Sequence, residues 1–409
     1  MGAGDGAPTA QITVPSTLRD RVRAIMEAHW REVGDFGFTV PNATVYPWQW
    51  LWDSCFHAVI WAELGDGERA VRELEALFAH QDDEGFLPHV IHHGNPGHHA
   101  EFWGRKRTSS ITQPPMYGHA VAELLRRGID VPDDLVARAH RGLGFLLRSR
   151  HRDGSGLVTV VHPWETGADN SPRWDDFCPG GFDEGRWKQA KGDLLATVER
   201  SAGGAPLYNT AFPVAPVGFN ALLVFNAREL LSETGEQFAD LGDEADALAR
   251  AVAARWDDDL RTWVDGGPSA GGSGRVRTAD ALLALVAVAR PEQVRAGYAQ
   301  VADPAAFGGA FGVRGVHREE PAFAPRTYWR GPTWPQLAYL LWLKPADGVR
   351  PPIERYLVQS TVAGAVRSGF AEYWDPDDGT GLGAIPQSWT GLALVMADHP
   401  RIGLDAPDG

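Results

Sequence analysis

The sequence predicts an all-α fold, an (α/α)6 barrel with long loops on one rim. About twelve segments space their apolar residues three and four apart, as amphipathic helices do. Longer connections follow mostly after every second segment, so one rim of a ring of helix pairs would carry them. Strand-like runs are few, and no fixed-period repeat supports the competing α-solenoid.

The first predicted helix covers residues 16–33, where Leu18, Val22, Met26 and Trp30 follow a possible serine cap at Ser16. The other predicted helices share this spacing and are expected at 52–64, 67–80, 116–127, 133–149, 217–234, 240–256, 278–290, 292–302, 334–344, 352–368 and 387–398. Short strands are expected within 36–45 and 157–162. The Gly-rich stretch 265–274 is too short for a linker between domains and is predicted to be a loop.

Length allows one large domain or two, composition favours a globular fold, and the lack of a long linker favours a single domain. The chain has 409 residues, of which 44% are hydrophobic and 22% charged. We expect a flexible N-terminal segment at 1–15, one barrel domain at 16–400 and a C-terminal tail at 401–409. The first fifteen residues lack the basic start and apolar run of a secretory signal, so a cytoplasmic location is expected.

Charge and cysteine content exclude several classes of protein. The net charge is −15, with 38 basic against 53 acidic residues, which argues against a nucleic-acid partner. No run of about eighteen apolar residues occurs, so no membrane span is expected. Two cysteines, Cys55 and Cys178, make neither a disulfide framework nor a zinc pattern. A homo-oligomer is left open.

Two separated segments place a carboxylate among aromatic rings. The first runs from Trp164 to Asp175 and contains Asp169, and the second, residues 370–376, contains Glu372. Glycosidic cleavage needs one protonated carboxyl to assist the leaving oxygen and one ionised carboxylate to activate water or attack directly. The pattern therefore favours a glycoside hydrolase, with Glu165 as the nearest rival to Asp169 for the acid.

Three further motifs stand in order with these two segments: Tyr-Pro-Trp-Gln-Trp-Leu-Trp-Asp-Ser at 46–54, Ile-Thr-Gln-Pro-Pro at 111–115 and Tyr-Trp-Arg-Gly-Pro-Thr-Trp at 328–334. With them the chain resembles glycoside hydrolase family 63 over residues 40–395, and within it the short bacterial mannosylglycerate and glucosylglycerate hydrolases. The resemblance implies an (α/α)6 barrel with long catalytic-face loops, inversion at the anomeric carbon, and no metal or organic cofactor. The chain departs from the family pattern near residues 177–204. This departure leaves the identity of the aglycone open.

The resemblance also implies roles for individual residues. Asp169 matches the general acid, and nearby indoles could raise its pKa by desolvation; Glu372 matches the general base. Asp53 is expected to bind sugar hydroxyls, although it could instead cap a helix. Arg330 and Gly331 are expected at the glycone, with a buried structural arginine as the alternative. The other expected substrate-binding residues are Trp50 and Trp52, as stacking surfaces, and on the aglycone side Tyr46, Gln113, Trp164, Tyr208, Tyr328, Trp329 and Trp334.

The substrate is expected to be a small-molecule α-glucoside or α-mannoside of a small acid, best matched by glycerate. A disaccharidase acting on trehalose or a related α-glucoside is the alternative within hydrolases. A sugar 2-epimerase on the same barrel would need paired histidines, and a non-catalytic carbohydrate-binding barrel would not need both carboxylates. The His-rich loop 89–99 is expected to line the pocket rather than to bind metal.

Overall fold

The structure is a computed structural model that describes residues 16–235, 239–268, 272–288, 290–343 and 350–398. The predicted N-terminal segment 1–15 and the tail 401–409 lie outside these described residues. The domain limits at 16 and 400 stay predictions.

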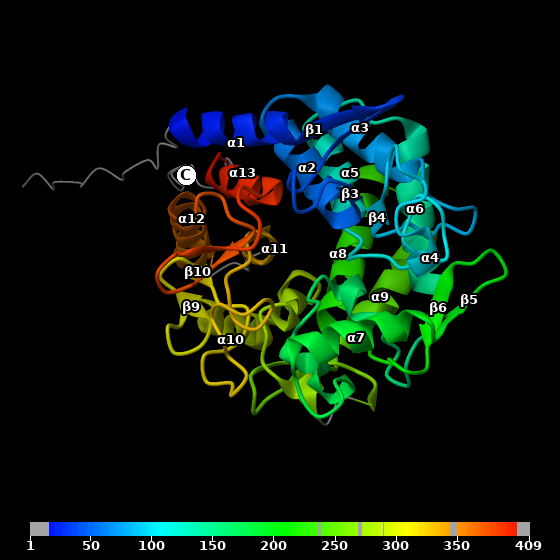
Figure 1. The fold of residues 1–409 in the computed structure, drawn as a ribbon. Helices are drawn as coiled ribbons and strands as arrows, with labels where there is room; N and C mark the ends of the chain where they lie inside the picture. Colours follow the sequence, from blue (N-terminus) through cyan, green and yellow to red (C-terminus); the bar gives the residue numbers. More distant parts are fainter. Residues whose placement is uncertain (1–15, 236–238, 269–271, 289, 344–349, 399–409) are drawn as a thin grey trace, which may run out of the picture.

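Six helical segments form a closed inner ring. Each packs against the next in chain order, and the last packs against the first. Figure 1 shows this closure, with α13 in red beside α2 in blue. The inner segments are α2 (Leu51–Glu63), α5 (Tyr117–Arg126), α8 (Val217–Thr234), the 3₁₀ segment η6 (Ala281–Val286), α11 (Pro335–Leu343) and α13 (Leu392–Asp398).

An outer helix packs against each inner segment. In the order of the inner ring these are α3 (Gly67–Phe78), α6 (Asp133–Arg148), α9 (Asp240–Ala253), α10 (Pro291–Ala302), α12 (Arg350–Arg367) and α1 (Ser16–His29). Burial follows the sequence pattern: α2 is buried at every position from Leu51 to Ala62, whereas α3 buries one face through Ala70, Leu74 and Leu77. The predicted (α/α)6 barrel is confirmed.

Four helical elements differ from the prediction. The first helix ends at His29, and Trp30–Val33 is strand β1, because this stretch pairs with β2 at Phe36–Thr39. The predicted helix 278–290 is only the short η6. Two helices were missed, α4 (Ala100–Trp103) and α7 (Glu184–Leu195), and α7 is largely polar and lacks an apolar period.

Strands are short and pair antiparallel in the connecting segments, and every pair except β3–β4 is a hairpin. Residues 157–162, predicted as a strand, make only an isolated bridge between Arg152 and Val158. The pairs besides β1–β2 are β3 (Gln49–Trp50) with β4 (Val90–Ile91), β5 (Val198–Arg200) with β6 (Pro206–Asn209), β7 (Trp256–Asp257) with β8 (Thr262–Trp263), β9 (Gly308–Gly309) with β10 (Gly312–Val313), and β11 (Tyr373–Trp374) with β12 (Gly381–Leu382). The connections that follow outer helices carry several of these hairpins and the site described below.

Within the described residues, no helix combines the length and apolar character needed to cross a membrane. Cys55 and Cys178 are both buried free thiols.

Candidate active site

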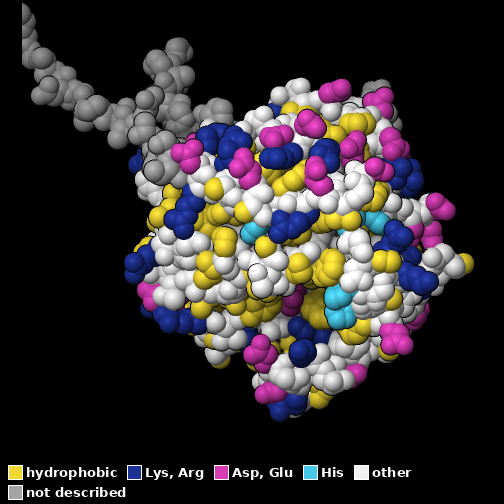
Figure 2. All heavy atoms as spheres, turned by 45° about the horizontal axis from the view of Figure 1, so that its top comes forward, with side chains coloured by type: hydrophobic (Ala, Val, Ile, Leu, Met, Phe, Trp, Pro, Cys, Tyr) yellow, Lys and Arg dark blue, Asp and Glu magenta, His cyan; other side chains and the backbone are white. Residues whose placement is uncertain are grey.

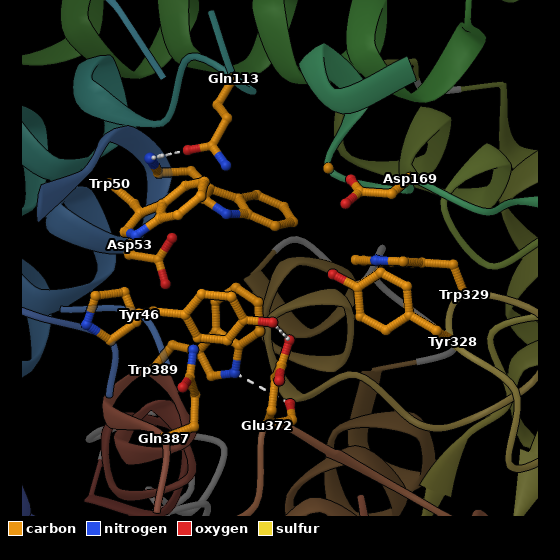
Figure 3. Close-up of a pocket in the computed structure, with 13 residues that line it drawn as sticks. Tyr46, Trp50, Asp53, Gln113, Asp169, Tyr328, Trp329, Glu372, Gln387 and Trp389 are labelled. Carbon is orange, nitrogen blue, oxygen red and sulfur yellow. Dashed lines mark hydrogen bonds between the residues drawn. The ribbon is translucent and has the colours of Figure 1, made fainter. Parts of the chain in front are cut away.

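A pocket opens where these connections meet at one end of the inner ring. It encloses about 450 Å³, which includes solvent at its mouth. One face of the molecule is hollowed near its middle, with hydrophobic side chains around the hollow (Figure 2). The pocket is lined by Pro41, Tyr46, Trp50, Trp52, Asp53, Gln113, Gly167, Asp169, Tyr328, Trp329, Glu372, Gln387 and Trp389 (Figure 3).

Glu372 accepts a hydrogen bond at each of its two carboxylate oxygens. It stands just before β11, where Oε1 accepts a hydrogen bond from the Tyr46 hydroxyl (3.1 Å) and Oε2 accepts one from the Ala384 amide (2.9 Å). The Trp389 indole donates to its backbone carbonyl (3.1 Å). Gly383 has φ +70°, and a Cβ there would lie 2.4 Å from Oε2. Only glycine therefore allows this close approach.

Asp169 lies on the opposite side of the pocket (Figure 3), in the connection between the 3₁₀ turns η1 (Pro163–Thr166) and η2 (Pro172–Phe177). The Trp187 indole donates to its backbone carbonyl (2.9 Å), and the Tyr328 side chain favours the ionised form of its carboxylate. Two residues earlier, Gly167 has φ +72°, and a Cβ there would meet the Trp52 ring at 2.5 Å. The loop therefore packs tightly against the pocket wall.

Burial raises the pKa of both carboxyls. The pKa of Asp169 rises to about 6, although the Lys191 ammonium and the Tyr328 hydroxyl oppose the rise. The pKa of Glu372 rises to about 7, because burial outweighs the hydrogen bonds from Ala384 and Tyr46. Asp53, in the first turn of α2, has its pKa raised well above its usual value by burial and then by Glu372. Both Asp169 and Glu372 therefore titrate near neutral pH.

Indole rings form much of the pocket wall. Trp52 meets Trp389 edge to face at 5.5 Å, and Trp329 stacks on Trp334 at 3.7 Å with planes 7° apart. Trp329 has φ +58°, a left-handed conformation that non-glycine residues rarely adopt and that clusters at functional sites. The buried Nε1 groups of Trp50 and Trp329 have no hydrogen-bond partner among the residues that the structure describes. They are donors available to a ligand.

Five predicted substrate-binding residues do not line this pocket: Trp164, Tyr208, Arg330, Gly331 and Trp334. Trp334 lies behind Trp329 in the stack, and Trp164 packs against His89, His162 and Trp103. Tyr208, on β6, packs on His151 with ring centroids 4.0 Å apart.

Arg330 was predicted at the glycone; it does not line this pocket, and its guanidinium has other partners. It forms two hydrogen bonds of 2.8 Å with Asp175 and lies 3.9 Å from the ring centroid of Phe182. Gly331 follows it, and a Cβ there would lie 2.8 Å from the backbone of Ala324. This arrangement matches the structural alternative for Arg330, a buried ion pair beside the acid loop.

Glu165, the rival for the general acid, is fully buried away from the pocket lining. Arg150 donates to both of its carboxylate oxygens at 2.5 Å. The amides of Thr112 and Val161 donate to them as well, at 3.0 and 2.9 Å. These donors fix the carboxylate in place, so Glu165 supports the loop that carries Asp169.

The His-rich loop 89–99 was predicted to line the pocket, and none of its residues does so. His92, His98 and His99 instead pack ring against ring beside Trp48. Sequence reasoning also missed Pro41, Gly167, Gln387 and Trp389 as lining residues. The polar and aromatic run at 386–389 was a signal for the last two, but it was assigned to a helix start.

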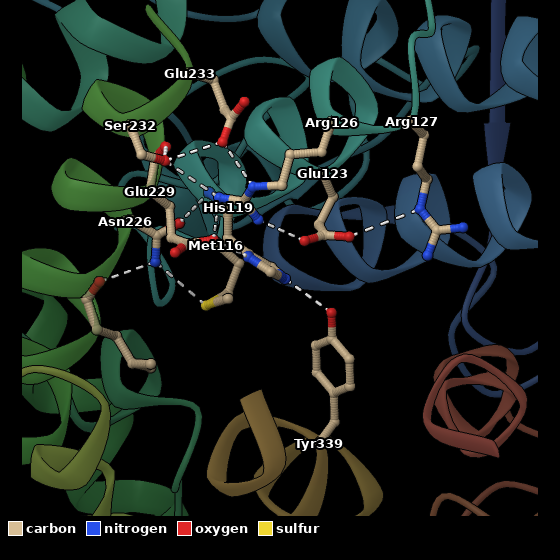
Figure 4. Close-up of polar contacts among 11 residues, drawn as sticks. Met116, His119, Glu123, Arg126, Arg127, Asn226, Glu229, Ser232, Glu233 and Tyr339 are labelled. Carbon is tan, nitrogen blue, oxygen red and sulfur yellow. Dashed lines mark hydrogen bonds and ion pairs between the residues drawn. The ribbon is translucent and has the colours of Figure 1, made fainter. Parts of the chain in front are cut away.

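His119, Glu123 and Glu229 form a polar cluster apart from the pocket, with potential metal-ligand atoms within 4.8 Å of one another (Figure 4). His119 already bonds Tyr339 through Nε2 (2.8 Å) and Glu229 through Nδ1 (3.2 Å). Arg126 donates to both glutamates at 2.6 Å. Because an arginine already neutralises the carboxylates, the cluster is a structural network that joins α5, α8 and α11.

Residues 46–390 match the mannosylglycerate hydrolase MGH1-like glycoside hydrolase domain family. The chain belongs to this family. It is therefore a glycoside hydrolase, and the predicted resemblance is confirmed.

Relatives within this glycoside hydrolase family match along most of the chain. A mannosylglycerate hydrolase of Thermus thermophilus is 32% identical, over 88% of this chain and 96% of the relative. A glucosylglycerate hydrolase of Mycolicibacterium hassiacum is 29% identical, over 87% of this chain and 93% of the relative.

Solved structures match the whole fold. The GH63 mannosylglycerate hydrolase of Thermus thermophilus in complex with Tris and D-glycerate superposes with a TM-score of 0.78 and 26% identity, covering 93% of this chain and 99% of that one. A yeast neutral trehalase, at 15% identity and a TM-score of 0.61, shares the fold alone.

Proposed function

We propose that this glycoside hydrolase cleaves glucosylglycerate or mannosylglycerate into free sugar and glycerate, with inversion at the anomeric carbon. The observation that carries the proposal is the pair of carboxyls, half-buried Asp169 and buried Glu372, on opposite sides of one aromatic pocket (Figure 3). The names of the two relatives above support the choice of substrates.

In the proposed reaction Asp169 gives its proton to the glycosidic oxygen while Glu372 takes a proton from water. That water attacks the anomeric carbon from the face opposite the leaving glycerate. Asp169 ends ionised and Glu372 ends protonated, and exchange with solvent restores both. Inversion needs room for the water, so we expect the two carboxyls to lie roughly 6.5 to 9.5 Å apart.

The lining residues divide between the two halves of the substrate. We assign Asp53, Trp50 and Trp52 to the glycone, where a charged acceptor and indole faces suit sugar hydroxyls and ring faces. Tyr46, Gln113, Tyr328 and Trp329 are assigned to the aglycone. Hydroxyl, amide and indole donors would then hold the glycerate carboxylate, because a buried unpaired carboxylate costs several kcal/mol.

The pH dependence of kcat/KM should be bell-shaped, with its maximum between the two carboxyl pKa values of about 6 and about 7. The order of these values is the reverse of the assigned roles, since the proposed base holds its proton more tightly by about one unit. Of the two singly protonated forms, the productive one carries its proton on Asp169. It is then about tenfold less populated than the form with the proton on Glu372. Both singly protonated forms have the same pH dependence, so the bell remains. A rate that rises or falls in one direction only from pH 5 to 8 would contradict a two-carboxyl mechanism.

The substrate assignment is tested by incubating the purified protein with glucosylglycerate, mannosylglycerate, trehalose and kojibiose and measuring released sugar. We expect sugar to be released from the glycerate glycosides. Replacing glycerate by glycerol as the aglycone should lower kcat/KM more than tenfold. The reason is that one charged hydrogen bond contributes about 1.5 to 3 kcal/mol. NMR of the first product should show the β-anomer from an α-glycoside.

Equal rates on the glycerate and glycerol glycosides, or faster hydrolysis of trehalose, would favour the disaccharidase instead. The 2-epimerase lacks support because no histidine is among the residues that line the pocket in the described part of the chain. A cytoplasmic location and a homo-oligomer remain proposals. The free thiols Cys55 and Cys178 fit a reducing compartment.

A further inference from the structure

Helix α7 packs its buried face against the loop that carries Asp169. Trp187 and Lys191, one helical turn apart, both reach this loop. The Trp187 indole donates to the carbonyl of Asp169 (2.9 Å), and the Lys191 ammonium donates to Oδ1 of Asn170 (2.7 Å). Two consecutive loop residues are therefore anchored by one helix.

The Lys191 ammonium is enclosed. The residue is 7% exposed, and Nζ lies 5.6 Å from the ring centroid of Trp164 and 5.8 Å from that of Trp187. Its hydrogen bond goes to the neutral amide of Asn170 rather than to a carboxylate. Its largest favourable charge interaction is with Asp169, ahead of Glu184.

Other groups around the acid carry less positive charge toward it. Arg330 donates to the carbonyl of Asn170 (3.3 Å), but Asp175 neutralises its guanidinium. Tyr328 is a neutral group that also favours the ionised form of Asp169. His162 bonds the carbonyl of Lys191, and burial holds its pKa at about 3, so it is neutral.

Two more groups act on Asp169 or Lys191 from farther away. Asp169 raises the pKa of Glu372 across the pocket, and Lys188, which lowers the pKa of Lys191, is exposed on α7. Among the described residues, Lys191 is thus the buried cation without a carboxylate hydrogen-bond partner that acts on the proposed acid.

We propose that Lys191 is a positioning residue for Asp169: it anchors the acid loop through Asn170 and sets the charge beside the acid carboxyl. The inference rests on the proposed function, in which Asp169 is the general acid. A half-buried carboxyl beside a fixed ammonium keeps a pKa close to neutral pH. Such a group can both give its proton and recover it.

Removing the charge should move the whole pH profile. Without Lys191 the ionised form of Asp169 loses its favourable neighbour, and its pKa should rise by about one unit, the low end for a nearby opposite charge. The midpoint of the bell is the mean of the two apparent pKa values. It should therefore move up by about half a pH unit, whichever carboxyl produces which limb.

The experiment compares Lys191→Gln, Lys191→Met, Lys191→Arg and Lys188→Met. Lys191→Gln keeps a donor for Asn170 without the charge, Lys191→Met removes both, and Lys191→Arg keeps the charge. Lys188→Met removes an equal charge from an exposed position on the same helix. The midpoint should rise in the Gln and Met variants and stay in place in the Arg variant and the Lys188 control.

Lys191→Met should also lower kcat on glycerate glycosides by about tenfold more than Lys191→Gln, because the acid loop loses its anchor. On α-glucosyl fluoride, whose leaving group needs little protonation, that difference should shrink.

An unmoved midpoint in folded Lys191→Gln and Lys191→Met, or an equal shift in Lys188→Met, would overturn the inference. Asp169→Asn, measured in parallel, separates this result from failure of the proposed function. If Asp169→Asn abolishes activity while the midpoint of the pH profile is unchanged in the Lys191→Gln and Lys191→Met variants, only the inference fails. If Asp169→Asn remains active, the acid assignment fails first.

Discussion

Asp169→Asn and Glu372→Gln should each lower kcat on glycerate glycosides by on the order of a hundredfold or more. Asparagine cannot donate the proton that the leaving oxygen needs, and glutamine cannot accept the proton of the attacking water. Initial rates of sugar release, measured between pH 6 and 7, give the loss directly. The two substitutions preserve side-chain shape, so the loss reports chemistry rather than repacking.

The two variants should differ in their response to the leaving group. Asp169→Asn should recover much of its activity on α-glucosyl fluoride, whereas Glu372→Gln should not, because both substrates need an activated water. Neither variant should lose stability. Each folded pKa lies above its unfolded value, so both carboxylates cost stability as the pH rises through about 6 and about 7. Near wild-type rates on a glycerate glycoside in either variant would remove that residue from its proposed role.

Glu165→Gln should destabilise the protein by about 3–5 kcal/mol, the cost of leaving a buried charge unpaired. Glu165 and Arg150 are both fully buried, and the two hydrogen bonds between them are 2.5 Å long. Urea unfolding at neutral pH measures the change. Arg150→Met should cost a similar amount, and the double variant less than the sum, because the two side chains depend on each other.

The Glu165→Gln variant also tests whether Glu165, rather than Asp169, is the general acid. Below its unfolding transition, Glu165→Gln should retain most of its kcat, since Glu165 does not line the pocket. A variant as stable as wild type but as inactive as Asp169→Asn would transfer the acid role to Glu165.

The two carboxyl positions and most of the aromatic lining were accessible from the sequence, because they lie in motifs whose residue order is itself informative. Tyr46, Trp50, Trp52, Asp53, Gln113, Tyr328 and Trp329 were all predicted as binding residues, and all line the pocket beside Asp169 and Glu372. Their roles in binding stay predictions. Gln387 and Trp389 were not predicted as lining residues because the run at 386–389 was assigned to the start of a helix.

Arg330 and Lys191 have contacts that the sequence did not reveal. Arg330 stands in a motif with Tyr328 and Trp329, but its guanidinium turns to Asp175, far away in the chain. Lys191 lies on a helix with no apolar period, so neither the helix nor its contact with Asn170 was foreseen. Adjacent residues can point to different sites, and only the folded chain decides which partners are within reach.

The sequence by itself determined the family, the ring of paired helices and the two carboxyl segments, because helical periodicity and motif order are local properties of the chain. Tertiary structure decided which acids are free to react. Glu165 and Asp169 are four residues apart, yet Arg150 neutralises one while burial raises the pKa of the other to about 6. Charge pairing and desolvation depend on neighbours brought together by folding, and these neighbours separate a structural carboxylate from a candidate catalytic one.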